Sequence, residues 1–135
     1  MYGHLIHVIT VYVTEPHPHG SRSPYNKGAG WQEWWQNPYT ASVDPNGSPL
    51  FQPRTFKERV AQAKSMIQKR GITTPVLIDE MDNPYWGTYG SMPNCGYLID
   101  QTGTVVERQS WFARGAGSTV DSTAMKNAIE ALFSQ

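Results

Sequence analysis

Apolar and polar positions are grouped along the chain in blocks that predict alternating strands and helices. Residues 8–13 are almost wholly apolar and mostly β-branched, which is typical of a buried strand in a parallel sheet. Residues 74–79 form a second block of this kind. Between them, four apolar residues recur at the spacing of one helical face: Phe56, Val60, Ala63 and Ile67. A strand, a helix and a strand in this order predict a right-handed parallel crossover.

The ends of this helix are marked by local signals. Thr55 and Glu58 fit a capping box, in which each side chain accepts a hydrogen bond from the other residue's backbone. Lys69 and Arg70 suit the negative end of the helix dipole, and Gly71 suits the left-handed position that follows a helix. We therefore predict a helix between Thr55 and Gly71.

The second half of the chain contains signals for a short helix and a hairpin. Asn83 followed by Pro84 looks like the N-cap and first residue of a helix that ends near Tyr89. Residues 97–108 predict an antiparallel hairpin, with Gly103 supplying the positive φ of its turn.

A C-terminal helix completes the pattern. Asp121 or Ser122 is expected to cap it. Its apolar face comprises Met125, Ile129, Leu132 and Phe133. The series as a whole is an α/β pattern without internal repeats, and a length of 135 residues suits one domain over residues 1–135.

Residues 15–53 lack a convincing periodic element and hold most of the chain's prolines. Trp31, Trp34 and Trp35 are spaced as on one helical face, so we expect one or two helical turns over residues 30–37. Loops longer than about 12–15 residues are uncommon in compact domains. This long Pro/Trp-rich loop is therefore expected to be a functional lid or an insertion.

The composition of the chain argues against some classes of binding partner. Acidic and basic residues balance at eleven each, so net charge gives no electrostatic footprint for nucleic acid or an anionic membrane. Cys95 is the single cysteine, which excludes an internal disulfide. No stretch approaches the roughly 18 apolar residues of a membrane-spanning helix, and the N-terminus lacks the pattern of a signal peptide. We therefore expect a soluble, cytoplasmic protein, and nothing in the sequence indicates a cofactor.

Three segments, residues 11–18, 76–83 and 89–103, resemble family motifs in the same order. They match the patterns VYxxEAHP, VVxDxMDN and YGAxPERLYVIDxxG of the iodothyronine deiodinases and their redoxin relatives, a branch of the thioredoxin-like superfamily. The resemblance runs from about Val8 to the C-terminus. It implies a thioredoxin-like α/β fold, with a mixed central sheet flanked by helices and a long inserted loop.

The redox residue of that family has no counterpart in this chain. The family's catalytic Cys or selenocysteine follows a strand that precedes the one matched by residues 8–13. Only seven residues precede Val8, which is fewer than the roughly ten that even a short crossover needs. The resemblance therefore implies a truncated or degenerate fold without the usual redox motif.

The missing strand is central in the family's sheet, so its loss leaves backbone groups of two strands to be paired. Three solutions are open: residues 8–13 pair directly with residues 97–100, a second subunit covers the gap, or the protein begins upstream of Met1. We favour rearrangement or a homodimer.

The resemblance implies candidate residues near the family's active-site face. Pro93, after Met92, aligns with the cis-proline beside the redox centre. Cys95 follows two residues later, and it can act as a nucleophile only if its thiol is activated. The nearest cation in the pattern is Arg108, across the hairpin. A buried free cysteine more often serves as a small apolar residue.

Glu15 and His17 fall on the Glu and His of the EAHP motif, where the resemblance implies a role for His in proton transfer. Without the nucleophile, His17 is expected to fix the loop. Together with His4, His7 and His19 it also suggests a metal site with imidazole ligands. We favour solvated loop histidines and no metal.

Two further groups of residues fit either a functional or a structural role. Five aromatic residues form a candidate ligand or partner surface: Trp31, Trp34, Trp35, Tyr39 and Trp86. A satellite core that tethers the long loop is the alternative. Asp79, Glu80 and Asp82 suit acid–base chemistry or a hard cation. Because an Asp at the end of a strand commonly forms a turn, we favour a structural role for them.

Three functions follow as hypotheses. We favour a binding or regulatory module for an unknown small molecule or protein, built on the degenerate scaffold. The second is a thiol oxidoreductase that uses Cys95. The third is a fragment of a deiodinase-like reductase whose redox centre lies upstream. Fold alone does not choose among them.

Overall fold

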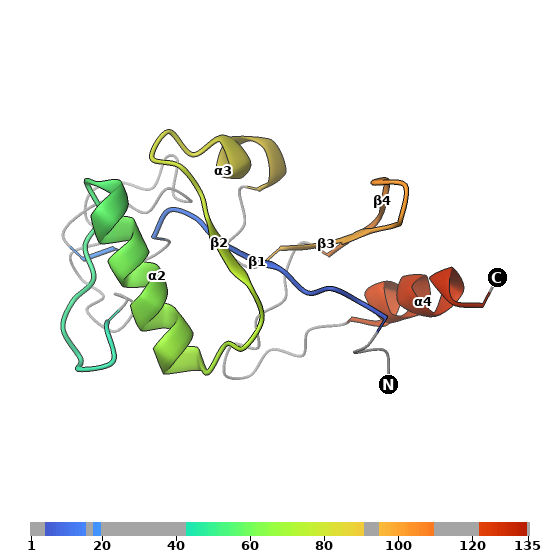
Figure 1. Ribbon diagram of the computed structural model, residues 1–135, viewed down its shortest axis with the longest axis horizontal. Coiled ribbons are helices and arrows are strands. Elements are labelled where there is room, and N and C mark those ends of the chain that lie inside the picture. The colour runs from blue at the N-terminus through green and yellow to red at the C-terminus, as the bar shows by residue number, and fades with distance from the viewer. Residues whose placement is uncertain (1–4, 16–17, 20–42, 91–94, 110–121, 135) are drawn as a thin grey trace, which may run out of the picture. The chain divides into compact units, whose positions relative to one another are not determined.

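The computed structural model describes residues 5–15, 18–19, 43–90, 95–109 and 122–134. Its elements, in chain order, are β1 (Thr10–Tyr12), α2 (Phe56–Arg70), β2 (Val76–Ile78), α3 (Pro84–Tyr89), β3 (Gly96–Ile99), β4 (Val105–Gln109) and α4 (Thr123–Leu132) (Figure 1). This mixture of helices and small sheets confirms the α/β class. The chain divides into two compact units, Met1–Tyr89 and Gly90–Gln135, and each is described by itself.

In the first unit, β1 and β2 lie side by side as parallel strands joined through α2 (Figure 1). Thr10 is opposite Val76 and Tyr12 is opposite Ile78. The Asp79 amide extends the ladder by donating to the Tyr12 carbonyl at 2.9 Å. The predicted parallel crossover is therefore confirmed.

The predicted burial of these strands was wrong in part. Both strands are shorter than the apolar blocks, and Val8, Ile9 and Leu77 are 56%, 57% and 56% exposed. Neighbouring residues of a strand point to opposite faces, and Val76 and Ile78 on either side of Leu77 are half-buried. Within this unit α2 packs on β2. Leu77 points to the opposite face from Val76 and Ile78, and its side chain stays largely exposed there.

Helix α2 forms as its end signals predict. The Glu58 amide donates to Thr55 Oγ1 at 3.2 Å, and the Thr55 amide donates to Glu58 Oε2 at 3.2 Å, which completes the capping box. Gly71 ends the helix with a φ of 62° in the left-handed region. Ala63 is fully buried, whereas Phe56 at the first turn is 42% exposed.

Helix α3 begins where predicted, but Asn83 is not the side chain that caps it. The Asn83 carbonyl accepts from the Gly87 amide at 2.9 Å, so Asn83 does occupy the N-cap position. Its backbone is left-handed, with a φ of 57°, and its side-chain Nδ2 donates to the Met81 carbonyl at 3.0 Å. The cap comes from Asp79 instead, as described below.

In the second unit, β3 and β4 form the predicted antiparallel hairpin. Tyr97 is opposite Arg108, and the register shifts between Leu98 and Ile99. Gly103 has a φ of 86° in the turn. Asp100 lies in this turn rather than in the strand, because its backbone N–H donates to the Thr104 carbonyl at 2.9 Å and closes the turn.

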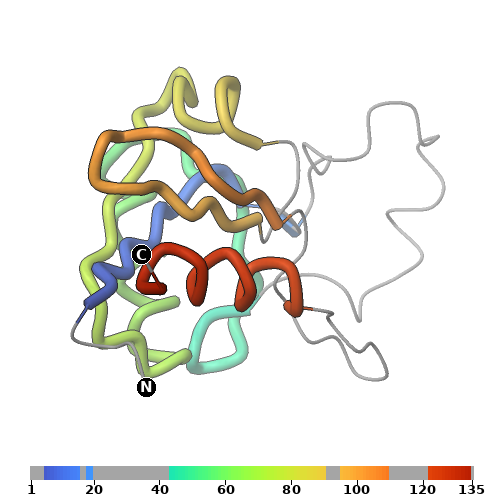
Figure 2. The backbone as a smooth tube through the Cα atoms, turned by 90° about the vertical axis from the view of Figure 1, so that its right-hand side faces the viewer, coloured from blue at the N-terminus to red at the C-terminus, as the bar shows by residue number. Residues whose placement is uncertain are grey.

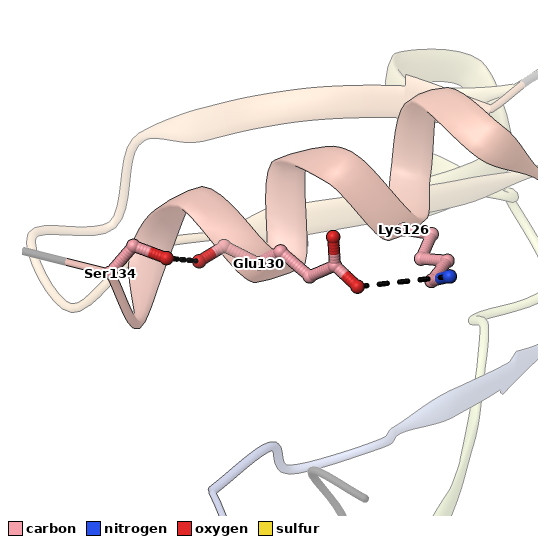
Figure 3. Close-up of polar contacts among 3 residues, drawn as sticks. All are labelled: Lys126, Glu130 and Ser134. Atoms are coloured by element: carbon pink, nitrogen blue, oxygen red, sulfur yellow. Dashed lines mark hydrogen bonds and ion pairs between the residues drawn. The ribbon is translucent and has the colours of Figure 1, made fainter.

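Helix α4 packs against both strands of the hairpin (Figure 2). Met125 is buried, whereas Phe133, expected on the apolar face, is 39% exposed. Ser122 is at the N-cap but makes no side-chain capping bond. On the exposed side, Lys126 Nζ lies 3.8 Å from Glu130 Oε1, and Ser134 Oγ donates to the Glu130 carbonyl at 2.7 Å (Figure 3).

Part of the predicted loop over residues 15–53 is described at its C-terminal end. Val43 and Pro49 form an isolated antiparallel bridge around a turn at Gly47, whose φ is 84°. Asp44 Oδ1 holds this turn by accepting from the amides of Asn46 and Ser48, both at 2.8 Å. The predicted helical turns over residues 30–37 and the predicted cis bond before Pro93 lie outside the described residues.

Candidate functional site

The residues at the carboxyl ends of β1 and β2 form a buried polar group in the first unit. Glu15, which follows β1, is 4% exposed, and Asp79, which follows β2, is 4% exposed. Arg59 of α2 is 2% exposed. In parallel α/β sheets, ligands bind outside the carboxyl ends of the strands. We name Tyr12, Glu15, Arg59, Gln62 and Asp79 the strand-end cluster.

Asp79 is the cap of α3. Its Oδ1 accepts from the amides of Glu80 at 3.1 Å and Tyr85 at 3.0 Å, and its Oδ2 accepts from the Trp86 amide at 2.9 Å. A carboxylate that accepts backbone N–H groups at a helix start satisfies donors that have no partner within the helix. The structural role predicted for Asp79 is confirmed.

Arg59 ties α2 to the end of β2. Its Nη1 donates to the Asp79 carbonyl at 3.0 Å and also to the Glu80 carbonyl. Its Nε is buried and has no hydrogen-bond partner. The ion pair found among the described residues is Lys126–Glu130, and none joins Arg59 to a carboxylate there.

Tyr12 connects Glu15 to α2. Its hydroxyl lies 3.3 Å from Glu15 Oε2 and 3.4 Å from Gln62 Oε1. Burial raises the pKa of Tyr12, and the charge of Glu15 and its hydrogen bond raise this pKa further, while the positive charge of Arg59 lowers it. The Tyr12 hydroxyl therefore stays protonated and is influenced by both charges.

Gln52 fastens the chain before the long loop to the chain after it. Its Oε1 lies 3.1 Å from Thr14 Oγ1 and accepts from the Glu15 amide at 3.2 Å, and its Nε2 donates to the Glu15 carbonyl at 2.6 Å. We call these contacts the Gln52 clasp. Nearby, the His19 amide donates to the Leu50 carbonyl at 2.6 Å, and Pro18 is fully buried.

Next to this clasp, His19 has an aromatic partner. The His19 ring meets Phe51 edge-on, with 5.2 Å between centroids. Within the described residues, no group of three or more His, Cys, Asp or Glu side chains is arranged to hold a metal ion.

Cys95 belongs to the second unit, where it precedes β3 and is half-buried. Arg108 Nε donates to the Tyr97 hydroxyl at 3.0 Å, and its guanidinium carbon lies 5.7 Å from the centre of the Tyr97 ring. The pKa of Arg108 is raised, first by the Tyr97 hydrogen bond and to a smaller extent by the electrostatic influence of Cys95. In the hairpin, Cys95 lies two residues before Tyr97, which is the residue opposite Arg108.

Of the predicted site residues, three lie in described parts of the chain. Glu15 is in the strand-end cluster, Trp86 is half-buried in α3, and Cys95 precedes β3. The others lie outside the described residues: His17, Trp31, Trp34, Trp35, Tyr39 and Pro93.

Sequence reasoning missed Arg59, Tyr12 and Gln52. Arg59 had one local signal, because it lies four residues before the fully buried Ala63 and so shares its helical face. A charged residue on an apolar stripe is rarely buried unless it has a partner. Gln52 has no such signal, since its partners are 37 and 38 residues away.

Comparison with known proteins adds no relative. No family model, curated protein or solved structure matches the chain. Among the helices described, none is both long and apolar enough to cross a membrane.

Proposed function

We propose that this chain is a thioredoxin-like domain of the deiodinase and redoxin branch that acts as a binding or regulatory module, without the usual redox motif of that branch. The order of elements supports the fold: a parallel β1–α2–β2 crossover, then α3, an antiparallel hairpin and α4. The three motif segments occur in the same order as in that branch.

The observation that carries the binding role is the Gln52 clasp. It joins Glu15 to Gln52, which flank residues 20–42, the Trp-rich segment. These contacts lie beside the carboxyl ends of two parallel strands. Binding residues are commonly presented on loops that a rigid scaffold positions. Trp31, Trp34, Trp35 and Tyr39 fall within that segment and supply the kind of side chain that ligand and partner surfaces favour.

The use of the buried side chains also supports binding over acid–base catalysis. Asp79 is occupied by three amide donors at 2.9 to 3.1 Å, and the Tyr12 hydroxyl is placed beside Glu15. These hydrogen bonds hold the ends of β1 and β2 in place. The ligand of such a module is a small molecule or a protein, and a homodimer is one way to cover the exposed apolar side chains Val8, Ile9 and Leu77.

A pair of variants tests the binding role. The hydrophobic dye ANS is titrated into wild-type protein, into the W31A/W34A/W35A triple variant and into C95S. The proposal expects dye fluorescence with the folded wild type, loss of most of it in the triple variant and no change in C95S. Equal fluorescence in the wild type and the triple variant, at equal helix content by circular dichroism, would contradict the proposal.

A thiol oxidoreductase that uses Cys95 is the second candidate, and the position of Arg108 favours it. A nearby guanidinium stabilises a thiolate, which is the reactive form of cysteine. The test is the rate of Cys95 alkylation against pH in native and in urea-unfolded protein. Native alkylation that is half-maximal below about pH 7 and is slowed in R108A indicates an activated thiolate.

Turnover separates the two candidates. The oxidoreductase predicts reduction of hydrogen peroxide or of a small disulfide, with a thiol reductant, that is lost in C95S. The binding module predicts no turnover that depends on Cys95, and alkylation only after unfolding.

A further inference from the structure

Arg59 has donors that the rest of the strand-end cluster does not use. A guanidinium has five N–H groups, and both hydrogens of Nη1 are directed to the carbonyls of Asp79 and Glu80. Nε–H is buried without an acceptor. The hydrogen bonds of this guanidinium to described residues are those from Nη1. The remaining edge of the guanidinium, Nε with Nη2, is the edge that matches two oxygens of one anion.

The energetics of burial favour filling this edge. Arg59 is 2% exposed, and a buried N–H group that has no acceptor costs free energy. The carboxylate of Asp79 accepts from the amides of Glu80, Tyr85 and Trp86. The carboxylate of Glu15 lies beside the Tyr12 hydroxyl. The two carbonyls on Nη1 carry only partial charges. The cluster therefore holds a cation with one unfilled edge.

The location is one where α/β proteins bind ligands. Arg59 reaches the first residues after β2, and Tyr12 at the end of the parallel partner strand lies within its electrostatic influence. Glu15 is the opposing charge of the cluster, and the Tyr12 hydroxyl is a second polar group beside it.

We propose that Arg59 binds a small oxyanion, a carboxylate or a phosphate group, two-pronged through Nε and Nη2 at the carboxyl ends of β1 and β2. This site goes beyond the proposed function, because it does not involve the aromatic residues of the Trp-rich segment.

The experiment follows the Arg59 Nε–H signal in the NMR spectrum of the full chain while inorganic phosphate is added. Sodium acetate is titrated in parallel, and sodium chloride keeps the ionic strength constant. We expect a saturable shift of this signal, with a dissociation constant on the order of 1 mM or below. A signal that does not move, or that moves equally with chloride alone, overturns the proposal.

Three variants sharpen the result. R59K keeps the charge but presents a point donor, so we expect at least about tenfold weaker phosphate binding, followed by thermal shift. E15Q removes the opposing charge and keeps an oxygen for the Tyr12 hydroxyl, so we expect binding several-fold tighter. K64Q removes an exposed charge from the same helix and is the control, for which we expect no change.

Each result either supports or overturns the proposed Arg59 site. Undiminished phosphate binding by R59K, or its loss in K64Q, overturns the proposal in favour of general counter-ion binding. If R59K fails to fold, the wild-type Nε–H signal together with E15Q still tests it. An unchanged phosphate response in W31A/W34A/W35A keeps this site separate from the proposed aromatic surface, so that either can fail alone.

Discussion

Asp79 in the first unit and Asp100 in the second have the same local role in different surroundings. Each follows a strand, and each holds the next turn by accepting three hydrogen bonds within 2.7–3.1 Å. Asp79 is 4% exposed, and its donors are the amides of Glu80 and of a helix. Asp100 is on an exposed hairpin turn, where water can replace its bonds. The two carboxylates make similar hydrogen bonds, but we expect their loss to cost more stability at the buried Asp79 than at Asp100.

The largest effect is expected from Asp79→Ala. The amides of Tyr85 and Trp86 then lose their acceptor in a site with little access to water, and unsatisfied buried donors are costly. We expect the free energy of unfolding in urea to fall by about 3 kcal/mol. Asp100→Ala is the matched control. Equal losses in the two variants would show that burial does not set the difference.

Gly103→Ala tests the hairpin without touching a carboxylate. Gly103 has a φ of 86°, and the left-handed region costs a residue with a Cβ about 1–2 kcal/mol. No atom lies within 4 Å of an added Cβ, so any loss comes from the backbone rather than from a clash. We expect urea unfolding to show a loss of that size. A neutral result would mean that the turn takes another conformation.

Thr55→Ala and Ser122→Ala compare the helix starts of the two units. Thr55 caps α2 through its side chain, whereas Ser122 makes no such bond. Removing a capping hydroxyl costs about 1 kcal/mol, so Thr55→Ala is expected to lose that amount and Ser122→Ala less than about 0.5 kcal/mol. Chemical denaturation of both variants measures the difference, and a larger loss in Ser122→Ala would contradict the assignment of the caps.

The smallest effect is expected in how the free energy of unfolding changes at acid pH. Hydrogen bonds from the Thr102 side chain and then from the Thr104 amide lower the pKa of Asp100 below its ordinary value of 3.8. A lowered native pKa contributes stability above the unfolded-state pKa, and this contribution is lost as pH falls through the native pKa. Asp100→Asn has no such titration. We expect the wild type and this variant to converge in stability as pH falls through the native pKa of Asp100, in urea melts at a series of pH values. A constant gap would argue against the shift.

The predictable part of the fold rested on signals that lie close together in sequence. Neighbouring residues alone specify the Thr55–Glu58 box, the left-handed Gly71 and the turn at Gly103. These features could therefore be predicted from the sequence. The parallel pairing of β1 and β2 followed from the order of elements. The α/β class was therefore predictable, whereas the thioredoxin-like relationship stays a prediction.

The parts that sequence did not reveal depend on distant partners. Asn83 was the plausible cap of α3 by position, but Asp79, which precedes it along the chain, supplies the oxygens. Arg59 is a charged residue of an amphipathic helix, and its burial depends on carbonyls about twenty residues later. Exposure of Leu77 depends on which faces are covered, which strand composition alone does not specify.

The Gln52 clasp has a consequence for the connection that it flanks. Because Gln52 holds Glu15, and Leu50 holds His19, the two sides of the connection between positions 19 and 43 are already joined. Bringing the ends of a loop together costs entropy that grows only slowly with loop length. The Gln52 clasp and the His19–Leu50 hydrogen bond therefore set the distance that any connection between these positions has to span.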